Sequence, residues 1–460
     1  MPAYVTLNPT TGRTEQEFAG LDDSAVPEVL RRSDDAFADW RATPAAERAQ
    51  LLIRIADAYG RREQELAELI TTEMGKPRNE AVGEVRLAAA IYRWYGEHGP
   101  DLLEREVLDP QGSDESVVQT EPVGPLIGVM PWNYPYYQVA RFVAPNLMAG
   151  NTIILKHAHL CAASSELMAE IVHTAGVPAD AYLNVFASNE QIADMIADPR
   201  VRGVSLTGSE RAGASVAETA GRNLKKAVLE LGGSDAFIVL DDGDLERTAE
   251  VGARARLSNT GQACNSPKRM IVGNDRLDEF TAIVTEAFES AQVGDPANPS
   301  TQVGPLSSTG ARDAVVDQVR RAVEQGATLH TGGDALDGDG AFMRPAVLTG
   351  VTPDMDAYSE EIFGPVAVIH GVESDDEAVA LANDVGFGLS GSVWGADIER
   401  AQRIADRLEV GMAYVNEHGT TLPGLPFGGV KRSGFGRELG RWGMGEFVNT
   451  RLRRTSKTKK

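Results

Sequence analysis

Cysteine is scarce in this sequence, and long apolar runs are missing from it. The 460 residues include two cysteines, Cys161 and Cys264. Two are too few for a disulfide framework, which favours a reducing cytoplasm. No run of about 18 apolar residues occurs, and the first residues combine neither a basic stretch nor an apolar segment. We therefore expect neither a membrane span nor export.

Positive charge is also in short supply. The chain carries 44 lysines and arginines against 67 aspartates and glutamates, for a net charge of −23. This balance disfavours nucleic acid and anionic membranes as partners, and we expect no metal site. The proportions of hydrophobic (42%) and charged (24%) residues are those of an ordinary globular protein. The length allows two or three domains.

The sequence lacks a GxGxxG motif after a predicted strand, yet its pattern from Val123 onward is α/β. Strands separated by helices of ten or more residues predict parallel βαβ units. Residues 4–18 predict a hairpin with its turn at Thr11-Gly12, and residues 44–74 and 81–96 predict helices. The predicted strands include PLIGVM, NTIILK, YLNVF, VRGVSLTGS, KKAVLELGG, AFIVL, KRMIVG, PAVLTGV and VAVIHGV.

Cys264 lies at the centre of SNTGQACNSPKR (258–269) and is a candidate nucleophile. A thiolate attacks carbonyl carbon readily, and the small residues around it leave backbone N–H groups free to meet an oxyanion. Taken alone, a cysteine in a chain without disulfides is more often a small buried hydrophobe. That second interpretation is the one we apply to Cys161, which begins a helical stretch apart from the other motifs.

Two further segments carry chemistry of their own. Glu230 stands between leucines and glycines in LELGG, where burial would be costly for a plain carboxylate and would raise its pKa towards that of a useful base. The segment SLTGSERAG (205–213) reads as a strand, a tight turn at Gly208 and a helix. A helix N-terminus of this kind suits a pyrophosphate.

Taken together, PWNYP (131–135), LELGGSD (229–235), the Cys264 segment and EEIFGPV (360–366) resemble the aldehyde dehydrogenase superfamily over nearly the whole chain. The segments LKHA, LELGGSD and FGGVKRSGFGRE are most similar to bacterial succinate-semialdehyde dehydrogenases. The resemblance implies an α/β fold with two Rossmann-like domains and a small β oligomerisation hairpin. The implied boundaries are 1–102 and 122–229 (dinucleotide-binding), 230–432 (catalytic), and 103–121 with 445–460 (oligomerisation).

In such a fold the hairpin segment pairs with the C-terminal strand of a neighbouring subunit, giving a homodimer or homotetramer. The implied chemistry is oxidation of an aldehyde to the acid through a cysteine thiohemiacetal and thioester. Cys264 would be the nucleophile, the Asn133 side chain and the Cys264 N–H the oxyanion donors, and Glu230 the base. Relatives that transfer the acyl group to coenzyme A generally lack this glutamate, so its presence favours hydrolysis.

The resemblance also implies a nicotinamide dinucleotide. Lys156 would hold a ribose, and Glu361 would bind the nicotinamide ribose. His159 occupies a position where many NAD-preferring members have glutamate; without that carboxylate a 2′-phosphate is not repelled, so we favour NADP and keep NAD open. The implied cofactor-binding residues are Pro131, Trp132, Lys156, His159, Gly208, Ser209, Gly213, Leu231, Gly232, Glu361 and Phe363.

Arg141, eight residues after Asn133, is the candidate substrate clamp. A guanidinium suits the distal carboxylate of succinate semialdehyde; a helix-surface salt bridge is the alternative. Ser258, where some such enzymes have a second arginine, and residues 416–426 depart from the pattern. Another small aliphatic or ω-substituted aldehyde therefore remains open. A catalytically silent relative is the remote alternative.

Overall fold

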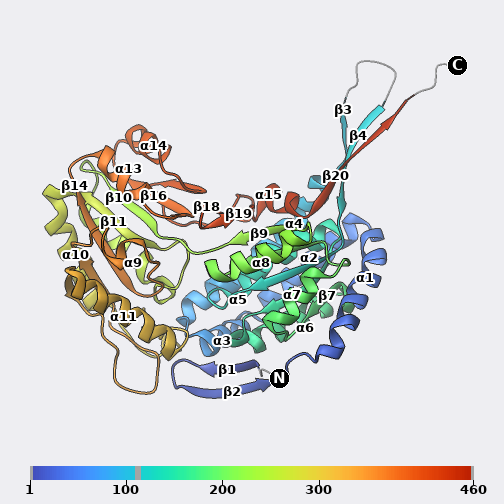
Figure 1. The fold of residues 1–460 in the computed structure, drawn as a ribbon, viewed down its shortest axis with the longest axis horizontal. Coiled ribbons are helices and arrows are strands. Elements are labelled where there is room, and N and C mark those ends of the chain that lie inside the picture. Colours follow the sequence, from blue (N-terminus) through green and yellow to red (C-terminus); the bar gives the residue numbers. More distant parts are fainter. Residues whose placement is uncertain (1–3, 109–114, 457–460) are drawn as a thin grey trace.

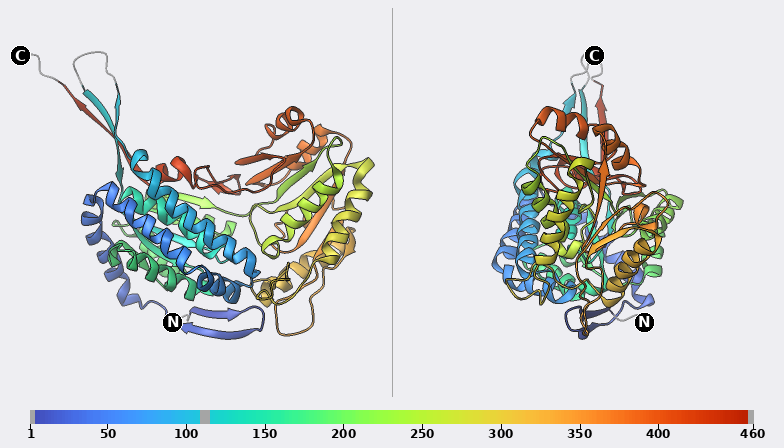
Figure 2. Two further views of the ribbon diagram at one scale, coloured as in Figure 1. Left: turned by 180° about the vertical axis from the view of Figure 1, so that it is seen from behind. Right: turned by 90° about the vertical axis from the view of Figure 1, so that its left-hand side faces the viewer.

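The computed structural model describes residues 4–108 and 115–456. The chain folds into two α/β halves lying side by side, and a small sheet projects from the outer end of the first half (Figures 1 and 2). The predicted α/β fold class is confirmed. None of the helices in the described ranges is both long enough and apolar enough to cross a membrane.

The first half is built on a mainly parallel sheet with the strand order β19-β9-β8-β5-β6-β7. The strands β9 to β7 run parallel, and β19 joins β9 in antiparallel pairing, with Gly434 opposite Glu230. The strands are β5 (Pro125–Met130), β6 (Thr152–His157), β7 (Tyr182–Asn184), β8 (Gly203–Thr207), β9 (Lys226–Glu230) and β19 (Gly434–Phe435).

Alternate side chains of this sheet enter two different apolar cores, as the period of a strand requires. Leu126, Ile153 and Leu155 pack with helices α2, α4, α5 and α6, whereas Ile127 and Ile154 pack with α1, α7 and α8. The sheet is therefore covered on both faces. The helices are α1 (Val26–Ala42), α2 (Ala45–Arg61), α4 (Arg78–Leu102), α5 (Pro135–Ala149), α6 (Ala162–Thr174), α7 (Asn189–Ala197) and α8 (Glu210–Arg222).

The second half has the strand order β12-β13-β14-β11-β10-β16-β17, parallel except for β12. Helices α9 and α10 pack on one face against Phe237 and Met270, and α13 and α14 pack on the other against Ile238 and Ile271. The elements are β10 (Asp235–Val239), β11 (Pro267–Gly273), β12 (Thr328–Thr331), β13 (Ala346–Thr349), β14 (Val366–Val372), β16 (Ser390–Trp394), β17 (Met412–Val415), α9 (Leu245–Leu257), α10 (Leu277–Ser290), α13 (Asp375–Asn383) and α14 (Ile398–Ala405).

The N-terminal predictions are confirmed with shifted boundaries. The hairpin forms with Gly12 at a positive φ of 69°, the predicted helix over 44–74 is divided at Arg62, and α4 extends well beyond 81–96. The remaining elements are β1 (Tyr4–Asn8), β2 (Arg13–Phe18), β15 (Phe387–Gly388), β18 (Val430–Lys431), α3 (Glu63–Met74), α11 (Thr309–Gln325), α12 (Asp356–Ser359), α15 (Gly440–Glu446) and the 3₁₀ turns η1 (Asp23–Ala25), η2 (His159–Cys161), η3 (Ala179–Ala181), η4 (Ser258–Gly261) and η5 (Asn274–Arg276).

The projecting sheet consists of β3 (Glu106–Leu108), β4 (Glu115–Pro122) and β20 (Val448–Thr455). Here the expectation of pairing with a neighbouring subunit's C-terminal strand is wrong. Strand β4 pairs along its whole length with β20 of the same chain, because α15 returns the C-terminus to the base of the projection (Figure 1). Residues 109–114 of the predicted hairpin lie outside the described residues.

Candidate active site

A cavity of about 290 Å³ opens at the carboxyl ends of β5 and β8, which are neighbours in the first sheet. Ligands of parallel α/β sheets commonly bind at this edge. Two lining residues, Gln138 and Thr207, were not anticipated from the sequence. The other lining residues are the predicted Pro131, Trp132, Asn133, Gly208, Ser209, Leu231, Gly232, Cys264, Glu361 and Phe363.

A second cavity, of about 350 Å³, lies between α7 and α8 and contains Lys156 and Arg211. Neither cation forms an ion pair within the described ranges, and burial lowers the pKa of Lys156. Ser209, the N-cap of α8, lines the first cavity, and Arg211, two residues later, lines the second. Two adjoining cavities, one with unpaired cations, fit the two ends of a dinucleotide.

Two predicted cofactor-binding residues, His159 and Gly213, line neither of these two cavities. His159 is exposed in η2 and lines neither of these two cavities. Gly213 lies inside α8, where a Cβ atom would come within 2.7 Å of the Leu231 side chain. Its lack of a side chain lets the helix pack closely against Leu231, just beyond β9.

The segment before Cys264 is strained. Asn259, Thr260 and Gly261 all have positive φ values, of 52°, 55° and 71°, and such conformations persist where surrounding contacts impose them. The buried Arg256 supplies those contacts: its guanidinium donates to the carbonyls of Gly261, Ile362, Gly364 and Val366. Burial lowers the pKa of Arg256 to about 9.

The Cys264 thiol is partly exposed to the first cavity. Burial raises its pKa to about 11, although the positive charges of Arg141 and Lys268 act in the opposite direction. A raised pKa favours the thiol over the thiolate at neutral pH, and a thiol must lose its proton before its sulfur can act as a nucleophile.

The Asn133 side chain is held from both ends. Gln138 Nε2 donates to its Oδ1 at 3.0 Å, and its Nδ2 donates to the Gln262 carbonyl at 3.0 Å. An amide nitrogen has two protons, so the second N–H is left for a ligand in the cavity. Asn259 Nδ2 additionally bonds the Asn133 carbonyl at 2.9 Å, which ties the Cys264 segment to the start of α5.

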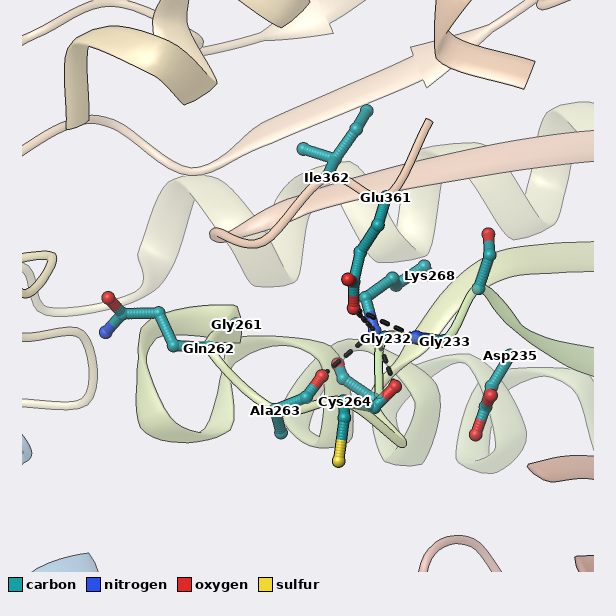
Figure 3. Close-up of polar contacts among 12 residues, drawn as sticks. Gly232, Gly233, Asp235, Gly261, Gln262, Ala263, Cys264, Lys268, Glu361 and Ile362 are labelled. Atoms are coloured by element: carbon teal, nitrogen blue, oxygen red, sulfur yellow. Dashed lines mark hydrogen bonds and ion pairs between the residues drawn. The ribbon is translucent and has the colours of Figure 1, made fainter. Parts of the chain in front are cut away.

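Lys268, at the beginning of β11, gathers three oxygen atoms around its ammonium (Figure 3). Its Nζ lies 2.9 Å from the Ala263 carbonyl, 2.7 Å from the Cys264 carbonyl and 3.1 Å from Glu361 Oε1. Glu361 also accepts from the Gly233 N–H at 3.1 Å. A Cβ on Gly232 would meet Glu361 Oε2 at 2.3 Å, and one on Gly233 would meet the Cys264 carbonyl at 2.5 Å. The two glycines of LELGG are thus required by close approach.

Glu230 ends β9 as a buried carboxyl group. Both of its oxygens lack a hydrogen-bond partner in the described part of the chain. Burial, and secondly the neighbouring Glu438, raise its pKa well above the ordinary value. It does not line the Cys264 cavity; its Oε1 lies against Gly428 instead.

Arg141 is fully buried in α5, so the helix-surface alternative is wrong. Its Nε pairs with Glu438 Oε2 at 2.6 Å, and its Nη1 donates to the Tyr137 hydroxyl at 3.1 Å. Arg141 does not line the Cys264 cavity, so its guanidinium is not brought directly to the Cys264 sulfur. Ser258 lines a separate cavity of about 490 Å³ beside α9 and α10.

Cys161 is buried, as expected of a structural residue, but it is not remote from the site motifs. Its Sγ lies 3.8 Å from the Trp132 carbonyl, beneath the turn that precedes Asn133. The sequence analysis also missed Lys268, Gln138 and Glu438. The one available signal was a basic pair, Lys268-Arg269, at the start of an otherwise apolar strand.

Comparison with known proteins agrees with this geometry. The family model described as "Aldehyde dehydrogenase family" matches residues 2–452. A succinate-semialdehyde dehydrogenase [NADP(+)] of Deinococcus radiodurans is 52% identical, covering 99% of this chain and 95% of its own length. A succinate semialdehyde dehydrogenase [NAD(P)+] of Escherichia coli is 40% identical, with 97% and 96% covered.

Solved structures are equally similar. The succinic semialdehyde dehydrogenase of Streptococcus pyogenes in complex with NADP+ superimposes with a TM-score of 0.96 at 42% identity, covering 98% of this chain and 99% of that one. The structure of Gox0499, determined to study its cofactor and substrate selection, has a TM-score of 0.97 at 42% identity. The match covers 99% of this chain and 100% of that one. By sequence and by fold, the chain belongs to the aldehyde dehydrogenase family.

Proposed function

We propose that this enzyme oxidises succinate semialdehyde to succinate, with NADP as the preferred cofactor and NAD as the alternative. The observation that carries the substrate assignment is the buried guanidinium of Arg141. It donates a hydrogen bond to the Tyr137 hydroxyl. That hydroxyl donates to Thr421, in the 416–426 segment, at 3.2 Å. The names of the Deinococcus and Escherichia relatives support the same substrate.

The chain's own residues account for the proposed chemistry. The Cys264 thiol gives up its proton to water in the cavity as its sulfur adds to the aldehyde carbon, and the free Asn133 N–H and the Cys264 N–H donate to the oxygen as it gains charge. A bound nicotinamide dinucleotide supplies the hydride acceptor. Glu230 then takes a proton from the water that attacks the thioester. For this step its side chain must rotate from Gly428 towards Cys264.

The cofactor assignment rests on the two cavities. Glu361 and Phe363 would hold the nicotinamide end beside Cys264, the Gly208–Ser209 turn would hold the pyrophosphate, and Lys156 the adenosine ribose. Arg211, in the same cavity as Lys156, adds a second positive charge that favours a 2′-phosphate. The names of the Deinococcus relative and of the Streptococcus structure, which both include NADP, support this preference.

The substrate carboxylate would bind beside Tyr137 and Thr421, with the Arg141 charge behind the tyrosine. Arg141 lies 4.7 Å from the centre of the Tyr137 ring, and its Nη2 has no hydrogen-bond partner among the described residues. An unpartnered, buried guanidinium N–H favours an anion nearby. Glu438 balances the charge when no substrate is bound.

Initial rates with succinate semialdehyde and butanal, each with NADP and with NAD, test this proposal. The carboxylated aldehyde should have a kcat/KM at least about 100-fold above that of butanal. Tyr137→Phe should reduce that preference about 10-fold, because it removes a hydroxyl beside the proposed binding site of the substrate carboxylate. The phenylalanine variant is preferable to one at Arg141, which would leave Glu438 buried without its counter-charge.

Other outcomes separate the alternatives. Equal rates for the two aldehydes would assign the enzyme to another small aliphatic or ω-substituted aldehyde. Absence of turnover across a broad aldehyde panel would leave a catalytically silent relative. A kcat/KM for NAD that equals or exceeds the value for NADP would contradict the cofactor preference.

We propose a homodimer or homotetramer for the assembly, in the reducing cytoplasm where Cys264 stays a free thiol. The small projecting sheet supports assembly because it exposes Val107 (60%) and Leu452 (61%) to solvent, far from either apolar core. Light scattering should give a native mass two or four times that of one chain. A mass equal to one chain would contradict it.

A further inference from the structure

We infer that Lys268 is the positioning residue of the oxyanion site: by holding the Ala263 carbonyl, it fixes the direction of the Cys264 N–H. This inference rests on the proposed function, in which Cys264 is the nucleophile. It assigns a role to a lysine that touches neither the aldehyde nor the sulfur.

The peptide bond between Ala263 and Cys264 couples Lys268 to the Cys264 N–H. The Ala263 carbonyl and the Cys264 N–H belong to the same peptide unit, and no cis peptide occurs in the described ranges. In a planar trans unit the two groups point in opposite directions. Lys268 Nζ lies 2.9 Å from the Ala263 oxygen, so the Cys264 N–H must point away from the ammonium. In Figure 3 the sulfur lies on that same side, away from Lys268.

The position of the Lys268 ammonium is fixed by three oxygen partners. A lysine has three N–H donors, and three oxygens surround this one: the Ala263 and Cys264 carbonyls and Glu361 Oε1. Its side chain is 3% exposed, so water does not compete effectively for these bonds. A second donor, the Ser266 N–H, reaches the Ala263 carbonyl at 3.3 Å and is the weaker partner.

The neighbouring backbone needs such a restraint. Three consecutive residues with positive φ, 259–261, end three positions before Cys264, and the Cys264 N–H donates no hydrogen bond within the described ranges. Without a partner of its own, the N–H depends on what holds the opposite end of its peptide unit. Lys268 also pairs with Glu361, at the proposed cofactor end of the cavity. The same ammonium therefore contacts both the proposed oxyanion site and a proposed cofactor-binding residue.

The test uses two reagents that attack the same sulfur in different ways. With p-nitrophenyl acetate and no dinucleotide, the Cys264 sulfur bonds to the acetyl carbon, p-nitrophenolate leaves, and the intermediate carries an oxyanion. With iodoacetamide the sulfur displaces iodide and no oxyanion forms. Lys268→Met should reduce the rate of the p-nitrophenolate burst about 10- to 100-fold. The rate of alkylation per thiolate, from its pH profile, should change little.

Lys431→Met is the matched control. Lys431 likewise donates to a carbonyl, that of Asn383 at 2.8 Å, and pairs with a carboxylate, Glu409, at 2.6 Å, but it does not line the Cys264 cavity. It should behave as the wild type. An unchanged burst in Lys268→Met, or an equal fall in burst and alkylation, would overturn the inference. A wild type inert to the ester and to aldehydes would instead overturn the proposed function. One-to-one alkylation of Cys264 verifies that each variant keeps a formed site.

Discussion

Replacing Cys264 by serine should lower kcat/KM for aldehyde oxidation by about 10⁴-fold or more, because among the described residues no other thiol lines the cavity to form the covalent intermediate. A hydroxyl is a much weaker nucleophile than a thiol, and Cys264 already has its pKa raised by burial. The measurement is steady-state reduction of NADP, together with a stopped-flow search for a burst. Cofactor binding, measured by fluorescence, should be nearly unchanged.

Cys161→Ser provides the matched control in the same chain. Cys161 is buried, and its sulfur contacts the Trp132 carbonyl. A serine hydroxyl can donate to the same oxygen, so most of the activity should remain. If the Cys264 variant kept substantial activity, or if the Cys161 variant lost as much, the assignment of the nucleophile would be wrong.

The second large effect is expected at Glu230. Glu230→Gln should slow steady-state turnover by about 10²- to 10⁴-fold while leaving the first turnover fast. A glutamine cannot accept the proton from water, so the thioester on Cys264 accumulates. Stopped-flow absorbance should then show one equivalent of reduced cofactor per active site, followed by a slow phase. Added hydroxylamine, a nucleophile that needs no base, should restore turnover.

The pH dependence supplies an independent check on the same residue. The base works only when deprotonated, and burial raises the pKa of Glu230. Hydrolysis in the wild type should therefore become faster as the pH rises towards that pKa and level off above it. In Glu230→Gln this rise should disappear from the slow phase. A glutamine variant without a burst, or with the wild-type pH profile, would show that Glu230 is not the base.

The strand pattern could place residues that lie at the ends of strands, whereas their proposed roles came from the resemblance to a known family. Asn133, Gly208 and Gly232 lie within three residues of the ends of β5, β8 and β9, and a strand pattern places such positions along one edge. Their presence around one cavity follows from the sheet order. The resemblance to a known family added Glu361, which lies in a loop that no strand pattern would bring to Cys264.

Side-chain direction could not be predicted in the same way. Arg141 has the residue type and position of a clamp, but its guanidinium turns to Glu438, almost 300 residues further along the chain. Glu230 similarly turns to Gly428 rather than into the cavity. Lys268 depends on three oxygens from two separate segments. Each of these arrangements results from packing between distant parts of the chain, which periodicity and motif spacing do not encode.

The raised pKa of Cys264 has a consequence for survival of the enzyme under oxidative stress. With a pKa of about 11, roughly one sulfur in 10⁴ is a thiolate at pH 7 in the resting protein. Hydrogen peroxide oxidises the thiolate and hardly reacts with the thiol. We therefore expect hydrogen peroxide to inactivate the resting enzyme slowly at pH 7, and faster as the pH rises and the thiolate fraction grows.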